Sequence, residues 1–335
     1  MSDIILHIGL NKTGTSSIQD FLALNAHTLL SEGLCYPKTG RDGAAHHVLS
    51  RWIATPEAER DLNKSPLAKA LRAEIEGMPL VVLSSEDLHT HGVRGARVLT
   101  RLFEGHRVRV VLYLREHLSY LASWYQQNIQ ASHLSSGFDT FCYLTFKPMH
   151  RIADAWAEGL GAENVITRLY DRSSLIGGDV LKDFAQVIGV QGDLGRYRRK
   201  PYENNPSVSG NLLFAKRLIN NLIDKPSASS MVSELDELAK LKPEFRGPMF
   251  VAADLVSYVV GMYKGDRKQL LDRYGIRIEE RSGDFKGSPY PDFSTLRSDW
   301  DLIQASARAA RYQFALAQDL LVLGDVARLA GGALR

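Results

Sequence analysis

Four short, mostly apolar runs recur in the first 170 residues of this 335-residue chain, and stretches with helical periodicity separate them. The runs are Ile4–Ile8, Leu80–Leu83, Val108–Leu114 and Val165–Tyr170. Runs of this length are typical of strands buried on both faces, and helices between such strands favour a parallel sheet. The sequence therefore predicts an α/β fold in which helices flank a parallel sheet.

The pattern changes near residue 190. Residues 191–209 are rich in turn formers and basic side chains, and β-type runs nearly vanish after them. Helical patterns follow at 209–222, 230–240, 249–263 and 300–330, and a loop rich in glycine, proline and serine interrupts them at 282–294. We therefore predict an α/β core at residues 1–208 and a helical extension at residues 209–335 that packs on this core.

Composition excludes several classes of protein. Lys plus Arg exceed Asp plus Glu by 41 to 38, and a net charge of +3 on this chain does not suggest a nucleic-acid binder. No apolar run reaches the roughly 18 residues of a membrane span, and the N-terminus lacks the pattern of a secretory signal. Cys35 and Cys142 provide neither a disulfide scaffold nor a cysteine-built zinc site. We expect a soluble, cytoplasmic protein with no integral membrane segment and no nucleic-acid partner.

Residues 7–17 lie between the first predicted strand and the first long helix. A loop at the carboxyl end of a parallel strand that opens a helix offers backbone N–H groups and the positive end of the helix dipole to an anion. Lys12 adds a full charge, and four hydroxyls follow it, at Thr13, Thr15, Ser16 and Ser17. A helix cap would account for one hydroxyl, not for four hydroxyls and a lysine. The segment therefore predicts an anion site.

The order of residues in this loop indicates one family. In an ordinary Walker A loop the lysine follows the second glycine, whereas Lys12 stands before Gly14, which disfavours a standard NTPase. The segment Lys12-Thr-Gly-Thr-Ser-Ser17 looks like the 5′-phosphosulfate loop of sulfotransferases that use 3′-phosphoadenosine 5′-phosphosulfate (PAPS). The resemblance implies a set of PAPS-binding residues, namely Lys12, Thr13, Gly14, Thr15, Ser16 and Ser17.

A second segment is similar to the 3′-phosphate motif of the same family. The run Val108–Leu114 ends in Arg115, and Ser123 follows eight positions later. Ser119 and Ser123 are four residues apart, hence on one face of the predicted helix 117–130. An arginine and a hydroxyl can bind the same phosphate. The resemblance implies that Arg115 and Ser123 do so.

Shorter likenesses to bacterial carbohydrate sulfotransferases extend over residues 4–222. They are carried by Ser84–Leu88, Arg168–Tyr170, Gly178–Phe184, Ile188–Gly189 and Asn204–Ser207. The resemblance implies a P-loop NTPase-like core, PAPS as co-substrate with PAP as product, and an acceptor hydroxyl on a carbohydrate or glycolipid. It also implies that Lys12 stabilises the leaving PAP, with no metal required.

The general base is left open between three residues. Glu86 follows the predicted strand Leu80–Leu83 at the edge where the other motif residues lie, and a carboxylate among apolar neighbours can be tuned to a useful pKa. His46 and His47 follow the first helix, and imidazole is a common base near neutral pH. His7 is interpreted as structural. No histidine joins Cys, Asp or Glu at the spacing of a zinc site, so no metal site is predicted.

Two other functions are kept as alternatives. Ser84-Ser-Glu-Asp87 after an apolar strand could imitate a Walker B acid and fit a small-molecule or nucleotide kinase, although the position of Lys12 weighs against it. The other alternative is a non-catalytic module that binds a nucleotide or polyanion. The basic stretch Arg196–Lys200 holds four cations in five residues. It is expected either to serve PAPS or an acidic acceptor, or to be an ordinary solvated loop.

Overall fold

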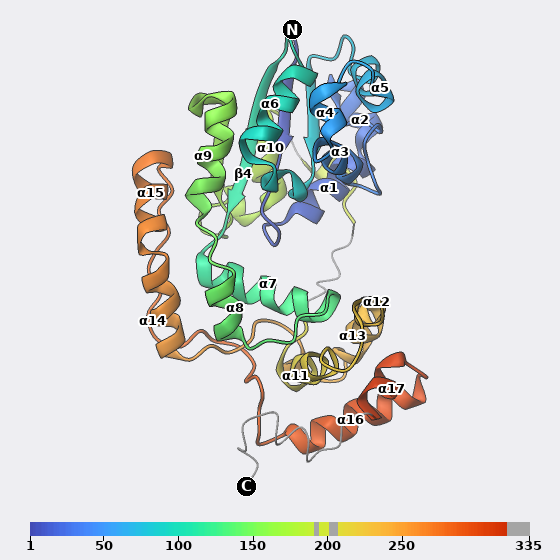
Figure 1. Cartoon of the computed structure of the whole chain (residues 1–335), viewed down its shortest axis with the longest axis vertical. Helices are drawn as coiled ribbons and strands as arrows, with labels where there is room; N and C mark the ends of the chain where they lie inside the picture. Colours follow the sequence, from blue (N-terminus) through green and yellow to red (C-terminus); the bar gives the residue numbers. More distant parts are fainter. Residues whose placement is uncertain (191–193, 201–206, 320–335) are drawn as a thin grey trace. The chain divides into compact units, whose positions relative to one another are not determined.

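The computed structural model describes residues 1–190, 194–200 and 207–319 (Figure 1). The end of the predicted helix at 300–330 and residues 204–206 of the Asn204–Ser207 motif lie outside the described residues. Contacts divide the chain into two compact units, each discontinuous in sequence. Unit 1 comprises Met1–Glu116, Lys147–Pro201 and Tyr263–Glu279, and unit 2 comprises His117–Phe146, Tyr202–Met262 and Glu280–Arg335.

Unit 1 is built on a five-stranded parallel sheet in its described residues. The strands are β1 (Asp3–His7), β2 (Leu34–Cys35), β3 (Leu80–Ser84), β4 (Arg107–Leu114) and β5 (Val165–Leu169), in the order β2-β3-β1-β4-β5. The central strand β1 pairs Ile5 with Val82 of β3 on one side and with Arg109 of β4 on the other. The predicted α/β class, a parallel sheet flanked by helices, is confirmed.

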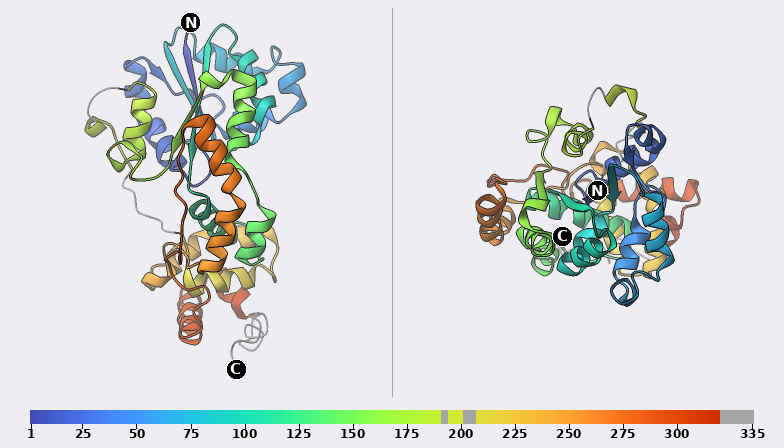
Figure 2. Two further views of the ribbon diagram at one scale, coloured as in Figure 1. Left: turned by 90° about the vertical axis from the view of Figure 1, so that its left-hand side faces the viewer. Right: turned by 90° about the horizontal axis from the view of Figure 1, so that it is seen from above.

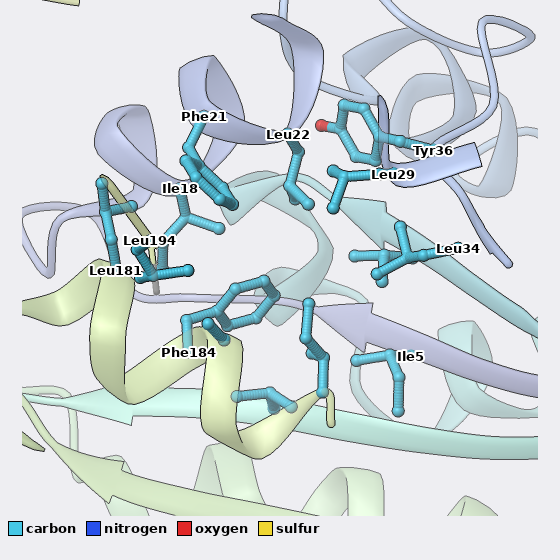
Figure 3. Packing of buried hydrophobic residues seen from close by; sticks show 14 of the residues in the cluster. Ile5, Ile18, Phe21, Leu22, Leu29, Leu34, Tyr36, Leu181, Phe184 and Leu194 are labelled. Atoms are coloured by element: carbon cyan, nitrogen blue, oxygen red, sulfur yellow. The ribbon is translucent and has the colours of Figure 1, made fainter. Parts of the chain in front are cut away.

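Helices cover both faces of this sheet (Figure 2). The helices of unit 1 are α1 (Thr15–Leu24), α2 (Ala26–Ser31), α3 (His47–Ile53), α4 (Pro56–Arg60), α5 (Pro66–Glu74), α6 (Gly92–Leu102), α9 (Met149–Leu160), α10 (Val180–Val187) and α15 (Lys264–Tyr274), the last of which packs on α9. Figure 3 shows Phe21 of α1 and Phe184 of α10 packed in one cluster with Ile5. Because side chains alternate along a strand, the fully buried Ile4 and Leu6 face the opposite side of the sheet.

Unit 2 is helical in its described residues. Its helices are α7 (His117–Ala131), α8 (Phe138–Leu144), α11 (Gly210–Ile219), α12 (Lys225–Ser230), α13 (Val232–Leu238), α14 (Ala253–Met262), α16 (Leu296–Ala309) and α17 (Gln313–Asp319). The buried Lys216 of α11 donates to the carbonyl of Ile129 in the last turn of α7, at 3.3 Å. A cation at that end of a helix offsets the negative end of the helix dipole.

The helix α15 belongs to unit 1, although it falls within the predicted helical extension. Its Asp266 accepts hydrogen bonds from the backbone N–H groups of Met149 and His150, both at 2.9 Å, and so caps the start of α9. The division into residues 1–208 and 209–335 stays a prediction, because contacts alone do not test whether either part folds by itself.

Candidate functional site

The carboxyl ends of β1 and β4 form the switch point of the sheet. The chain leaves β1 for the edge strand β2 on one side and leaves β4 for the edge strand β5 on the other. Ligands of parallel α/β sheets bind in the crevice at such a point. The loop with Lys12 follows β1 and Arg115 follows β4, and the Nη1 of Arg115 donates to the carbonyl oxygen of Lys12 at 2.9 Å. The structure therefore brings these two predicted site residues together.

The loop between β1 and α1 has a strained, closely packed backbone. Lys12 has a φ of 67°, which is in the left-handed region that non-glycine residues rarely adopt. The buried Thr13 closes the turn, since its Oγ1 donates to the carbonyl of Leu10 at 2.6 Å and accepts from the N–H of Leu10 at 3.3 Å. Gly14 has a φ of 76°, and a Cβ there would lie 3.0 Å from Cε2 of Tyr170. The fold thus requires glycine at position 14.

The predicted hydroxyls divide into two groups. Thr13 and Thr15 are buried, whereas Ser16 is exposed and Ser17 is half-buried. The N-cap of α1 is Gly14, which has no side chain, and the first turn of the helix contains no acidic residue. The helix therefore contributes no carboxylate of its own to offset the positive end of its dipole, which can interact favourably with an anion.

Two cations and an aromatic ring border this loop. Burial, and then the charge of Arg115, lowers the pKa of Lys12. The guanidinium carbon of Arg115 lies 6.0 Å from the ring centre of Tyr170, just after β5. The sequence singled out Tyr170 only for its family likeness, and no local pattern indicated that it packs against Gly14 and Arg115.

Glu86 follows β3 and begins the 3-10 helix Glu86–Thr90. Its half-buried carboxylate accepts a hydrogen bond from Nε2 of Gln19, at 2.6 Å through Oε2. Oε1 bonds to no residue in the part of the chain that the structure describes. Gln19 lies on α1 three residues after Ser16, about one turn or ~4.5 Å along the helix. The bond therefore holds Glu86 near the first turn of α1, the helix that follows the loop between β1 and α1. This loop, which carries Lys12, is called the lysine loop.

The two adjacent histidines have different surroundings. His46 is fully buried, its Nε2 lies 3.1 Å from the carbonyl of Pro37, and its Nδ1 accepts from the N–H of Ser84 at 3.2 Å. Burial, with a smaller effect of Arg41, lowers the pKa of His46 to about 3. A neutral ring with both nitrogens bonded to backbone favours a role in holding β3 in place over proton abstraction from a substrate.

His47 is more accessible, and its side chain is 26% exposed. Its Nδ1 lies 3.0 Å from Oδ2 of Asp87 and 2.9 Å from Oγ of Ser85, and its Nε2 bonds to none of the described residues. A carboxylate at Nδ1 fixes the tautomer and leaves Nε2 as the proton acceptor. Asp87 was not identified as a histidine partner from the sequence, because the two residues are 40 positions apart.

A buried chain of polar groups lies behind Glu86. Nζ of Lys147 is 2.6 Å from Nε2 of His89, and Nδ1 of His89 bonds to the carbonyl of Glu86. Burial lowers the pKa of Lys147 and, more strongly, that of His89, to about 4. Sequence reasoning missed Lys147, which lies 61 positions from Glu86. His7 is also buried, with Nδ1 at 2.7 Å from Oγ of Ser84, consistent with a structural role.

The second half of the predicted 3′-phosphate motif lies in unit 2. Ser119 and Ser123 are on α7, whereas Arg115 belongs to unit 1. Nη2 of Arg281 donates to Oγ of Ser119 at 3.1 Å, which adds a cation to this face of α7 that the sequence did not indicate. The joint binding of one phosphate by Arg115 and Ser123 stays a prediction.

The basic stretch Arg196–Lys200 is largely neutralised within unit 1. Arg196 pairs with Glu32, Arg199 with Asp179 and Lys200 with Asp20, at distances of 3.1, 2.8 and 2.7 Å. The backbone of Arg198 exchanges two hydrogen bonds of 2.8 Å with the side chain of Asn25. The guanidinium of Arg198 pairs with no acid among the described residues.

The residues that the structure describes contain neither a candidate metal set nor a candidate membrane span. No three side chains of His, Cys, Asp or Glu come together there as a metal set. No described helix combines the length and the apolar character needed to cross a bilayer.

Comparisons with known proteins are sparse. No family model matches the chain. An uncharacterized protein of Archaeoglobus fulgidus is 23% identical over 171 residues, which cover 50% of this chain and 46% of that protein. The chain therefore spans about half the length of this relative. Among solved structures, a sulfotransferase from Alicyclobacillus acidocaldarius is similar, with a TM-score of 0.39 and 12% identity over 80% of this chain and 94% of that chain. Neither likeness identifies a function for this chain, so the residues of the site carry the assignment.

Proposed function

We propose that this chain is a PAPS-dependent sulfotransferase that transfers a sulfuryl group to an acceptor hydroxyl. The observation that carries the proposal is the hydrogen bond from Arg115 to the carbonyl of Lys12, which supports one anion site at the β1–β4 crevice. PAPS bears anionic groups at both its 5′ and 3′ positions. Lys12 after β1 and Arg115 after β4 place two cations at neighbouring strand ends, and two cations match the two anionic groups of PAPS better than a single lysine does.

The cations supply what the reaction needs. A bond forms between the acceptor oxygen and sulfur while the bond from sulfur to the bridging phosphate oxygen breaks, and the acceptor proton passes to a base. Lys12 donates to the bridging oxygen as it becomes negative, and its lowered pKa makes that donation easier. Ser16, Ser17 and the first turn of α1 bind the 5′-phosphosulfate. Arg115 binds the 3′-phosphate, and Ser123 is assigned to that phosphate from the family motif alone.

We assign the base to Glu86, with His47 as the second candidate. Gln19 orients Glu86 through Oε2, and Oε1 is left to accept the proton. His47, oriented by Asp87, offers Nε2 for the same task. His46, named with them from the sequence, is proposed instead to position Ser84 and the end of β3.

The acceptor class rests on the family resemblance, which favours a hydroxyl of a carbohydrate or glycolipid. The proposed test supplies [³⁵S]PAPS with a panel of oligosaccharides, glycolipids, phenols and sterols to the purified chain. Transfer to a glycan or glycolipid is the expected result. Transfer to phenols or sterols alone contradicts the acceptor class, and no transfer to any acceptor contradicts the activity.

Ligand binding separates this function from a kinase. Ligands that bind the native state raise its apparent stability. We expect PAP to raise the melting temperature more than AMP, ADP or ATP does, with no dependence on Mg²⁺. A shift by ATP that requires Mg²⁺ favours the kinase. A shift by PAP with no turnover of PAPS on the acceptor panel favours the non-catalytic module.

A further inference from the structure

A cavity of about 580 Å³ lies within unit 2, and none of the residues assigned above lines it. Its walls come from the start of α8, from α11, from residues 249–252 with the helix α14 that follows them, and from the loop around Tyr290. This volume falls in the range of pockets that hold small organic ligands.

The walls expose large apolar side chains. Phe250 and Tyr258 are 39% and 45% exposed, and Phe138 lines the cavity beside them. Exposed apolar side chains that gather in one patch are a feature of ligand-binding grooves and interaction sites. The cavity therefore suits a ligand with a flat, apolar body.

Arg217 of α11 is the cation of this cavity. Its guanidinium carbon lies 5.1 Å from the ring centre of Phe214 and 5.3 Å from that of Tyr290. The hydroxyl of Tyr290 is 3.1 Å from that of Tyr125, and Tyr125 donates to the carbonyl of Ser136 at 2.8 Å. These contacts hold the guanidinium in place before any ligand binds, which lowers the entropic cost of binding.

The acids that line the cavity do not pair with this guanidinium. Asp254 lies in the first turn of α14, where its Oδ1 accepts from the N–H of Leu255 at 2.8 Å. Asp139 lies in the first turn of α8. No carboxylate within the described ranges forms an ion pair with Arg217. Arg217 hydrogen-bonds the hydroxyls of Tyr125 and Tyr290, and the guanidinium has further N–H donors for an anionic group. A planar carboxylate is the best match to such a guanidinium.

We propose that this cavity is a binding site for a small aromatic carboxylate, whose ring packs against Phe138 and Tyr258 and whose carboxylate pairs with Arg217. The site is built from unit 2 alone and needs neither Lys12 nor Arg115. It therefore goes beyond the sulfotransferase proposal and can be correct or wrong independently of it.

The test compares two probes of the same shape on the full chain, naphthalene-2-carboxylate and neutral 2-naphthalenemethanol, by isothermal titration calorimetry. A charged hydrogen bond contributes about 1.5–3 kcal/mol, so the carboxylate is expected to bind roughly 10- to 150-fold more tightly than the alcohol. Arg217→Gln removes that preference. Arg297→Gln, an exposed arginine on α16 outside the cavity, and Lys12→Ala both keep it.

Equal affinity of the two probes for the wild type, or no binding of either at millimolar concentration, overturns the proposal. Loss of carboxylate binding in Lys12→Ala also overturns it, because the probe then occupies the lysine loop. If Arg217→Gln does not fold, Tyr258→Ala decides, since that side chain is half exposed and its removal is compatible with folding. It is expected to weaken both probes about equally, and unchanged affinities contradict the site.

Discussion

Two regions of unit 1 contain lysine and arginine side chains, and they differ in the groups that these cations contact. In the lysine loop, Arg115 bonds to the carbonyl of Lys12, and the pKa of Lys12 is lowered. In the stretch Arg196–Lys200, three of the four cations pair with acids on α1, after α2 and at the start of α10. The first region concentrates positive charge at a strand end, and the second joins neighbouring elements of the fold.

A cluster of cations in a sequence therefore does not by itself indicate an anion site. The pairs of Arg196 and Lys200 join residues more than 160 positions apart, with acids that no local pattern connects to them. Exposed pairs of this kind contribute little to stability, but they do reduce the charge available to a ligand.

Lys12→Ala is expected to have the largest effect, because it should abolish detectable transfer while the chain stays folded. Loss of a donor to a developing negative charge typically costs about 10²–10³ in rate, and Lys12 also supplies full charge. The measurement is the single-turnover rate with PAPS and an active acceptor. The exposed Lys69→Ala on α5 is the control. Wild-type turnover in Lys12→Ala would remove this lysine from the mechanism.

The second-largest effect is expected from replacing the proposed general base, Glu86. Glu86→Gln is expected to lower kcat by about 10²-fold or more, because the amide cannot accept the acceptor proton. His47→Asn should have a smaller effect, and the pH–rate profile of each variant identifies which group titrates. If Glu86→Gln keeps a normal rate and His47→Asn loses its acid limb, the base is His47.

Arg115→Ala tests the second cation of the crevice. We expect a roughly 10- to 150-fold loss of affinity for PAP and little change for AMP, which lacks the 3′-phosphate. Arg107→Ala, an exposed residue at the other end of the same strand, should bind PAP normally. Equal affinity of the wild type for PAP and AMP contradicts this assignment.

Buried histidines beneath the loop predict a pH dependence of stability. Burial lowers the pKa of His7 and His46 to about 3, so the unfolded chain binds more protons below pH 6.5, and stability falls as pH falls. From pH 7 to pH 5 the loss is of the order of 2 kcal/mol for each histidine. Urea denaturation at both pH values measures it, and His46→Gln should flatten the dependence. Equal stability at pH 7 and pH 5 would refute the buried, neutral state of both rings.

The smallest effect is expected in the basic stretch. Arg199→Ala with Lys200→Ala should lower the free energy of unfolding by about 0.2–1 kcal/mol per pair and leave the Michaelis constant for PAPS unchanged. Arg198→Ala, which breaks no described ion pair, is the matched variant. A raised Michaelis constant for PAPS in either variant, together with a wild-type Michaelis constant that rises with salt, would show that this stretch also contacts a ligand.

The sequence predicted four of the five described strands, and it missed β2. Leu34–Cys35 is a two-residue edge strand, too short for any periodicity to detect. The first long helix expected after the lysine loop is divided in the structure, since α1 ends at Leu24 and α2 begins at Ala26. Asn25 separates them, since its side chain donates to the carbonyl of Phe21 at 2.8 Å and also bonds to the backbone of Arg198. That second partner is 173 positions away.

Four of the strands, the lysine loop and the arginine that follows β4 could be predicted from the sequence, because periodicity, turn residues and strand ends are local properties of a chain. Which polar groups face each other depends on how distant parts of the chain pack, and the sequence did not indicate it. In the folded chain the ring of His46 bonds to backbone, whereas the ring of its neighbour His47 is oriented by Asp87. Glu86 bonds to Gln19, which is 67 positions away. Burial and the charges of distant residues determine whether a side chain can bind a ligand or accept a proton. Both depend on the packed structure, because distant residues come together only when the chain folds.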